Sequence, residues 1–498
     1  MVRAEEEGGI RAWISAILEG DSDPKLEAEL PFASMMITLM AASGITPYES
    51  FKRMRGVKVL EKFKEEGDEI VRLVEVLGND PLTAMEKRAD ATISRQYADF
   101  LEGYISSVKS GGSVINYLTS KLRGIFDEHA AKAHNAIERL ETLVEAYMVM
   151  LIVIFCFYII SSVTSPTTGM MGNVGLPDTS AMVYPLILVV IPVFSLFFMY
   201  MANNIRPGTL KGMRRPYYVA LVPGVLFLLF FIASQMLPSL SFVNELVSTP
   251  LLVTAGLVFV STPPWLVYRG IAKKNYAAEA AIPSLLRDVT EARRTGLSPE
   301  KAIVHAADRR GYGLFTEDLR RIINQIEWGV SLRKIYYDLS SWVKSWPVVV
   351  NFFILVETIE IGGGDADTLS ILAEFSEKTQ TIEKGQRDML TPYVILPFIW
   401  TILMVFTVTF TIQTLSNIPS LALGAIGGAE MLKGAANDSQ IIEAGIMFHS
   451  WLSGFFIGKI SEGNFASGFR YSALLILTAY ATLVISKSLV VSFMGGLF

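Results

Sequence analysis

The sequence is poor in cysteine and histidine, the residues that most often form disulfides and bind transition metals. Cys156 is the single cysteine, so no disulfide can form within the chain and no oxidising compartment is indicated. His129 and His134 are five residues apart, which puts them off a common metal-binding face of a helix. The acidic stretch of residues 1–20 lacks the apolar core of a secretory signal. We therefore expect no metal site, no cofactor and no signal peptide.

The short motifs of the common enzyme classes are also missing. The nearest approach to a phosphate-binding GxxxxGK[ST] loop is the stretch 454–459, which is one residue short and lies in an apolar segment. No HExxH or GxSxG motif occurs, and Cys156 has no polar neighbours in the sequence that would activate it. The sequence therefore predicts a protein that is not an enzyme and has no catalytic residues.

Two aspartates support one enzymatic alternative, a GxGD-type intramembrane aspartyl protease. Asp338 follows a tyrosine and Asp365 follows three glycines, and two such carboxylates can divide acid and base roles. That chemistry requires both aspartates inside apolar helices, whereas Asp338 lies among polar and aromatic residues and Asp365 follows a run broken by two glutamates. We favour a glycine-rich turn in which Asp365 or Asp367 caps the next helix, because the similar turn at 110–113 has no aspartate.

Apolar residues are abundant and gather in long runs. The mean hydropathy is +0.41 and 51% of the residues are hydrophobic, which is too high for an ordinary soluble protein. Runs of about twenty apolar residues are long enough to cross a bilayer as helices. They predict seven transmembrane helices, at residues 143–163, 182–201, 217–236, 250–268, 391–412, 441–458 and 472–495.

The remaining sequence forms two polar blocks with helical patterns. We therefore predict an all-α polytopic membrane protein with two cytoplasmic helical bundles. Its four regions are a first helical domain at 1–143, whose repeat begins near residue 28, four spans in 144–268, a second helical domain at 269–390, and three spans in 391–498.

Lysine and arginine are segregated between the loops, which the net charge of −5 hides. Loop 202–216 contains four basic residues and three more follow the fourth span, whereas loops 164–181 and 237–249 contain none. Basic residues concentrate on the cytoplasmic side of a membrane. Seven spans then place the N-terminus and both polar blocks in the cytoplasm and the C-terminus outside, for a multi-pass protein of the cytoplasmic membrane.

The two polar blocks contain the same pattern, which indicates an internal duplication. The stretch LPFASMMITLMAASGITPYESF begins at residue 30 and matches IPSLLRDVTEARRTGLSPEKAI at an offset of 252 residues. A glycine turn follows in each block, within 109–112 and 361–364. The residues that define the repeat are Pro31, Gly44, Pro47, Gly111 and Gly112 in the first copy, and Pro283, Gly296, Pro299, Gly363 and Gly364 in the second.

Each copy is predicted to open as a helix, a tight turn and a second helix. Pro31 and Pro283 suit the first turn of a helix, where the missing N–H costs nothing. Gly44 and Gly296 suit the left-handed residue that follows a helix end. A threonine or serine comes next as an N-cap, with a proline at the following position.

Basic residues cluster in corresponding parts of both copies. Such patches can dock an acidic protein or anionic lipid headgroups, or they can simply be solvated helix faces that obey the positive-inside rule. Nucleic acid is not expected as a partner, because the first block contains 18 basic against 24 acidic residues. The candidate docking residues are Lys52, Arg53, Arg55 and Lys58 in the first copy, and Arg287, Arg293, Arg294, Arg309, Arg310, Arg320 and Arg321 in the second.

Few polar residues lie within the predicted spans. Glu443 and Lys487 fall near span ends, where long side chains can reach the interface, and His449 is the central one. Paired charges at mid-depth would favour a polytopic transporter, which stays an alternative, but the duplicated part is the polar one. Small residues also recur every fourth position in the sixth span, which favours close packing within the chain over a homodimer contact. These small residues are Ser450, Gly454 and Gly458.

Two helical domains that share this helix, glycine, Ser/Thr-Pro, helix pattern and a later glycine turn resemble the type II secretion F domain. The resemblance covers residues 28–160 and 279–412. Four spans between the copies and three after them are similar to the archaeal members, namely the archaellum assembly protein J and archaeal pilus platforms. Bacterial members have a Gly-Glu pair at the second turn, where this chain has Gly363-Gly364, so no role of that glutamate is carried over.

The resemblance implies a non-enzymatic membrane platform that builds a type IV pilus-like filament, such as an archaellum or an archaeal pilus. Such a platform works with a cytoplasmic hexameric secretion ATPase and with pilin-like or archaellin-like subunits, which it moves from the membrane into the filament. It also contacts membrane lipid and allows a homodimer. The basic residues named above would form the ATPase-docking surface.

Overall fold

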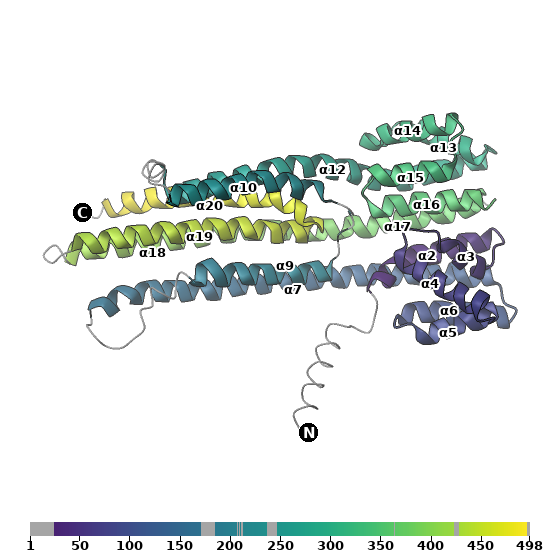
Figure 1. Cartoon of the computed structure of the whole chain (residues 1–498), viewed down its shortest axis with the longest axis horizontal. Coiled ribbons are helices and arrows are strands. Elements are labelled where there is room, and N and C mark those ends of the chain that lie inside the picture. The colour runs from purple at the N-terminus through teal and green to yellow at the C-terminus, as the bar shows by residue number, and fades with distance from the viewer. Residues whose placement is uncertain are drawn as a thin grey trace, which may run out of the picture. The chain divides into compact units, whose positions relative to one another are not determined.

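The computed structural model describes residues 24–170, 185–206, 208, 210, 213–236, 247–362, 364–422 and 428–495. Within these residues every element is a helix and no strand occurs, as the sequence predicted (Figure 1). The chain divides into two compact units. Unit 1 comprises residues 1–134 and 273–384, and unit 2 comprises residues 135–272 and 385–498.

Unit 1 contains the same succession of helices twice. The first copy consists of α2 (Pro24–Ala42), α3 (Pro47–Met54), α4 (Glu61–Val71) with the π-helical η1 (Arg72–Val76), α5 (Pro81–Ala91), α6 (Arg95–Lys109) and the start of α7 (Val114–Met170). The second consists of the end of α12 (Thr249–Arg294), α13 (Pro299–Ala307), η4 (Gly313–Phe315), α14 (Thr316–Glu327), α15 (Leu332–Trp342), α16 (Trp346–Glu360) and the start of α17 (Ala366–Leu390). The predicted duplication is therefore confirmed at the level of helices.

Three turns are built on glycine in both copies. Gly44 and Gly296 have φ of 84° and 87°, which confirms the predicted left-handed residue after the first helix. The later predicted turn also pairs a left-handed residue in each copy, Gly111 with φ 71° and Gly362 with φ 90°. A third pair, at residues 78 and 329, was not predicted. Gly112 is not left-handed, Gly364 has φ 60°, and Gly363 lies outside the described residues.

The repeat prolines divide into two groups. Pro47 and Pro299 are the first residues of α3 and α13, as predicted. Pro31 and Pro283 were predicted in a first turn, but the structure places them inside α2 and α12. In α2 the preceding turns bury their apolar side chains, and in α12 the helix arrives from an apolar segment without a break. Burial and helix continuity thus outweigh the local cost of proline, about 3 kcal/mol.

The two copies share one apolar core in unit 1. Phe32 of α2 packs edge-on against Trp346 of α16, with ring centroids 4.7 Å apart. Phe126 of α7 and Phe375 of α17 are 4.6 Å apart. The indole N–H of Trp346 donates to the carbonyl oxygen of residue 59 at 3.0 Å, so a polar contact also joins the copies. Unit 1 is therefore a single folded body made from two distant parts of the chain.

The helices of the second copy run back and forth between two ends. At one end the guanidinium of Arg293 donates to the carbonyl oxygen of Gly364 at 2.5 Å, and Arg333 at the start of α15 reaches Glu360 at the end of α16. At the other end the side-chain oxygen of Asn275 accepts from the backbone N–H groups of residues 344 and 345. The glycine turns at residues 296, 329 and 362 therefore lie together at one end of unit 1. We name this end the turn end.

The first copy runs between the same two ends. The carboxylate of Glu29 accepts from the N–H of Lys62 and Phe63, so α4 begins beside the start of α2. Lys132 of α7 reaches both Glu27 and Gln96, which places the start of α6 there too. Helices that begin at this end finish at the turns at 44, 78 and 111. Six glycine turns, three from each copy, thus close one end of unit 1.

Unit 2 contains η2 (Leu186–Val190), α9 (Ile191–Ile205), α10 (Arg215–Met236), η5 (Pro392–Val394), α18 (Ile395–Ala422), α19 (Gly428–Glu462), η6 (Phe465–Ser467) and α20 (Gly468–Gly495), with parts of α7, α12 and α17. Among the described residues six helices are long and apolar enough to cross a membrane. They overlap six of the seven predicted spans, and residues 182–184 of the second span lie outside the described residues. The remaining span, 143–163, falls in α7, and its side chains beyond residue 156 lie outside the described ones.

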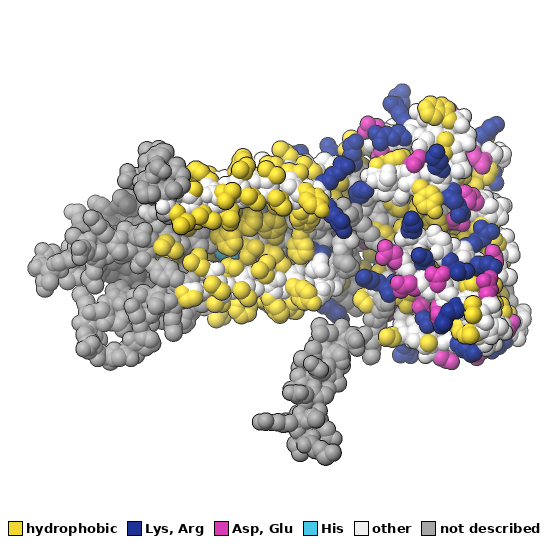
Figure 2. Space-filling view, viewed as in Figure 1, with side chains coloured by type: hydrophobic (Ala, Val, Ile, Leu, Met, Phe, Trp, Pro, Cys, Tyr) yellow, Lys and Arg dark blue, Asp and Glu magenta, His cyan; other side chains and the backbone are white. Residues whose placement is uncertain are grey.

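The surface of unit 2 fits a lipid environment. Large apolar side chains point outward along its helices, such as Leu221, Phe259 and Ile399. Figure 2 shows a continuous apolar surface over the described part of unit 2 and mixed charges over unit 1. Such an apolar surface would be unstable in water. The fold is therefore that of an all-α polytopic membrane protein, as predicted.

Helices α19 and α20 pack unusually closely. A Cβ atom on Gly454 would lie 2.2 Å from the backbone nitrogen of Ser472. A Cβ atom on Gly458 would lie 2.3 Å from the backbone nitrogen of Gly468. The small-residue stripe therefore packs within the chain, which confirms the favoured prediction.

Candidate functional site

The candidate docking residues of the first copy lie on α3 and the loop that follows it. The ammonium of Lys52 is 2.8 Å from Glu75, and its hydrogen bond lowers the pKa of that carboxyl. Arg55 is 2.8 Å from Asp68. Arg53 and Lys58 are exposed; Arg53 lies 4.0 Å from Glu49, and Lys58 has no ion pair within the described residues. Most of these charges thus have an acidic neighbour on the surface, where such pairs contribute little to stability.

The candidate residues of the second copy divide into paired and unpaired ones. Arg287 contacts Glu377 and Arg309 contacts Asp288. Arg294 pairs with Glu291, three residues earlier on α12. Among these second-copy candidates, Arg310 and Arg320 are exposed and have no ion pair within the described residues.

Arg293 has an internal role instead. Its guanidinium donates to the carbonyl oxygens of Leu297 and Gly364, one in each neighbouring glycine turn. A guanidinium with several fixed donors is suited to tying carbonyl oxygens together. We therefore regard Arg293 as a residue that holds the turn end and leave it out of the docking proposal below.

The structure does not gather the second-copy residues into one patch. Arg293 and Arg294 lie at the turn end. Arg321 pairs with Glu317, which also pairs with Lys274 near the opposite end of unit 1. Arg320 and Arg321 are thus separated along the length of unit 1 from Arg293 and Arg294 of α12.

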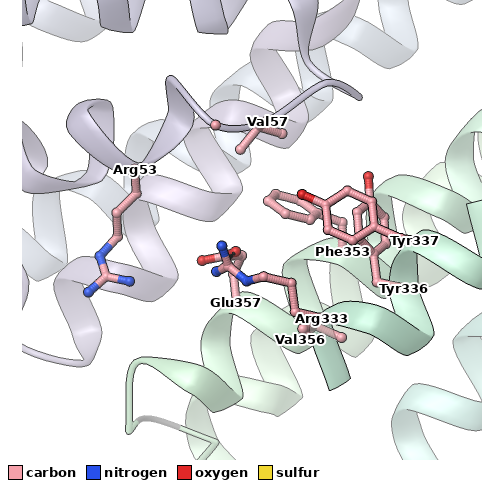
Figure 3. Close-up of a pocket in the computed structure, with 9 residues that line it drawn as sticks. Arg53, Val57, Arg333, Tyr336, Tyr337, Phe353, Val356 and Glu357 are labelled. Atoms are coloured by element: carbon pink, nitrogen blue, oxygen red, sulfur yellow. Dashed lines mark hydrogen bonds and ion pairs between the residues drawn. The ribbon is translucent and has the colours of Figure 1, made fainter. Parts of the chain in front are cut away.

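A cavity of about 110 Å³ lies between the two copies in unit 1. In Figure 3 the side chains of Arg53 and Val57 come from one side, and those of Arg333 and Glu357 from the other. Its remaining lining residues are Gly56, Tyr336, Tyr337, Phe353 and Val356. The sequence did not predict this site. At an offset of 251, Arg333 and Glu357 align with Leu82 and Ser106, so the duplication carries no trace of it.

The centre of the cavity wall is an ion-pair network. Arg333 lies 2.5 Å from Glu357 and 2.8 Å from Glu360. Only 4% of Glu357 is exposed, and this burial raises the pKa of its carboxyl although Arg333 lowers it. Burial also raises the pKa of Tyr336 to about 12. Because the Arg333 guanidinium faces two carboxylates, it has no spare positive charge for an anionic ligand, and we assign its ion-pair network to the stability of unit 1.

The two aspartates of the protease alternative lie in unit 1. Asp365 is the N-cap of α17, where its carboxylate accepts from the N–H of Thr368 at 3.2 Å. This contact confirms the predicted capping role. Asp338 lies on α15 and accepts from the side-chain amide of Gln325 at 2.9 Å. Helix α15 is not one of the helices long and apolar enough to span a membrane.

The three polar residues singled out in the predicted spans each have a polar neighbour in unit 2. Glu443 is buried and lies 2.8 Å from Lys487, so it does not reach outward as we had expected. The buried His449 is 3.4 Å from the hydroxyl of Ser453. That hydroxyl is 2.9 Å from Tyr147, a residue that sequence patterns did not single out. Among the described residues no group of acidic, histidine or cysteine side chains could hold a metal ion.

Comparison with known proteins gives one family and one relative. The family model described as type II secretion system (T2SS), protein F matches residues 32–161 and 285–412, which together exceed half of the chain. An uncharacterised protein of Methanocaldococcus jannaschii is 22% identical over 500 aligned positions, covering 93% of this chain and 80% of that protein. No solved structure matches. The matched ranges correspond to the two helical copies and the apolar helices that follow them.

Proposed function

Because the chain belongs to the type II secretion system protein F family, whose members are membrane platforms of secretion and pilus-type systems, we propose that it is the platform of a type IV pilus-like filament. The filament would be an archaellum or an archaeal pilus. The observation that carries this proposal is the duplication, because two copies of one helical domain form a shared core and each continues into apolar helices.

The proposed platform works without an active site of its own. Family members act with a secretion ATPase and pilin-like subunits. We propose that a hexameric ATPase binds unit 1 in the cytoplasm, and that its strokes drive pilin-like or archaellin-like subunits from the membrane into the filament base. A shared core supports this role, because closely packed interiors transmit strain rather than absorb it.

The proposed orientation follows the loop charges. Loop 202–216 and the end of the fourth span are basic, so we propose that unit 1 and the N-terminus lie in the cytoplasm. The C-terminus would then lie outside. The closely packed stripe on α19 contacts α20, so it supports no particular homodimer surface.

Deletion of the gene tests the proposed function directly. Electron microscopy of the deletion strain, with swimming scored on the same culture, is expected to reveal cells without filaments. Loss of filaments and motility together would identify an archaellum platform, and loss of filaments with swimming retained would identify an adhesion-pilus platform. Intact filaments of every kind would contradict the proposal and leave pseudopilus secretion or transport to be tested.

Charge reversal of the docking residues is expected to weaken ATPase binding at least about tenfold in a pull-down, because charge pairs at interfaces steer and hold partners. The two variants are Arg320→Glu with Arg321→Glu, and Lys52→Glu with Lys58→Glu. The charge-matched control is Arg95→Glu with Lys301→Glu, two exposed residues outside the candidate set. Equal binding by all three proteins would contradict the docking assignment.

A further inference from the structure

Among the described residues of unit 1, Trp328 is the most exposed large apolar side chain. It is the C-cap of α14, directly before the left-handed Gly329, and 82% of its surface is accessible. Tryptophan is highly buried on average, and it is enriched among the interface residues that carry most of the binding energy. The exposure of Trp328 therefore indicates that its side chain contacts a partner outside unit 1.

The corresponding turn of the first copy carries the same feature. At an offset of 251 residues Trp328 aligns with Leu77 and Gly329 aligns with Gly78. Leu77 is 59% exposed, its neighbour Val76 is 74% exposed, and Gly78 is left-handed like its counterpart. Two copies that differ at most surface positions thus both present an apolar side chain at one turn.

Leu77 and Trp328, which we name the anchors, both lie at the turn end of unit 1. The chain passes from unit 1 to unit 2 after residues 134 and 384 and returns before residue 273. Helices α7, α12 and α17 run between these positions and the turn end. The anchors are therefore held on short glycine turns at the end of unit 1 where α7 and α17 begin and α12 ends.

Two similar apolar anchors fit a partner that has two equivalent apolar pockets. Because both turns place an apolar side chain directly before a left-handed glycine, the simplest partner offers the same pocket twice. A homo-oligomeric protein offers identical pockets on neighbouring subunits. Two linked contacts of this kind strengthen binding far beyond either alone.

We propose that Leu77 and Trp328 are paired anchors that insert into equivalent apolar pockets on two subunits of a soluble homo-oligomeric protein. This proposal rests on the proposed function, under which the partner is the hexameric secretion ATPase. It adds two apolar contacts to that function, beside the basic residues on α3 and α14.

Binding of the full-length protein in lipid nanodiscs to the purified secretion ATPase of the same organism tests the proposal. Trp328→Ser and Leu77→Ser are each expected to weaken binding to the hexamer about tenfold or more, and the double variant further. Trp328→Phe should keep most of the affinity. The matched control is Ile93→Ser, because Ile93 is 70% exposed but lies on the turn between α5 and α6, at the opposite end.

The outcomes separate this inference from the proposed function. If the wild-type protein binds the ATPase and the Trp328→Ser and Leu77→Ser variants bind it equally well, the anchor proposal is overturned and the platform function stands. Equal loss in Ile93→Ser, or disruption of self-association instead of ATPase binding, would overturn it as well. Absence of wild-type binding to the hexamer would overturn both the anchors and the ATPase assignment. Loss confined to the anchor variants, with similar thermal unfolding of all proteins, is the expected result.

Discussion

Replacing Gly454 with valine is expected to reduce the amount of folded protein in the membrane at least about tenfold. Even the first atom of a side chain would fall 2.2 Å from the backbone nitrogen of Ser472, and a backbone cannot rotate away as a side chain can. Helices α19 and α20 must then separate, which removes contacts along their whole interface. Gly458→Val should behave alike, because its Cβ would meet the backbone of Gly468.

The measurement is the amount of monodisperse full-length protein recovered in detergent after equal expression. Gly270→Val is the matched control, because Gly270 is also helical but has open space where the side chain would go. Recovery of the Gly454 variant at the level of this control would mean that α19 and α20 are not in close contact in the membrane.

Removal of the Arg333 guanidinium is expected to destabilise unit 1 by about 3 kcal/mol, near the lower limit for breaking a buried ion pair. The lower value is chosen because 49% of the Arg333 side chain is exposed, so water screens part of the interaction. In Arg333→Leu the buried Glu357 keeps its charge without a partner. Thermal unfolding of the detergent-solubilised full-length protein measures the effect.

The loss in Arg333→Leu should depend on pH with a definite sign. Burial already raises the pKa of Glu357, and without Arg333 the main cause that lowers it is gone. A carboxyl whose pKa is higher in the folded state makes that state more stable at low pH, and this stability is lost as pH rises through the folded-state pKa. The variant should therefore lose less stability at pH 5 than at pH 8.

Arg320→Leu serves as the control for this pH dependence, since Arg320 is exposed and has no ion pair within the described residues. Its unfolding temperature should stay close to wild type at both pH values. A pH-independent loss in Arg333→Leu would mean that Glu357 finds another partner, and no loss at all would mean that the network does not stabilise unit 1.

The features that the sequence predicted well are those encoded by local patterns. Gly44 and Gly296 marked the same turn because only glycine takes that backbone conformation freely. The apolar runs marked the spans because a bilayer requires a fixed length of apolar helix. Asp365 was recognised as a cap from its position after a glycine turn. Each of these signals depends only on neighbours in the chain.

The features that the sequence did not predict depend on contacts between residues far apart in the chain. Pro31 lies inside a helix because residues far away in the chain bury the preceding turn. The cavity wall of Arg333 and Glu357 is specific to the second copy, so comparison of the copies gave no sign of it. Trp328 is exposed because of how the rest of unit 1 packs, and a local sequence pattern does not contain that information. An offset of 251 in place of 252 would have revealed its likeness to Leu77.

The shared core of unit 1 also has a consequence for biosynthesis. Trp346 contacts the backbone of Val59, which leaves the ribosome 287 residues earlier. At about 5–20 residues per second, the first copy waits roughly 15 to 60 seconds for its counterpart. During that time Phe32, buried in the finished protein, has no aromatic partner from the second copy. The nascent first copy is thus the stage at which this protein is most exposed to aggregation, proteolysis and chaperone capture.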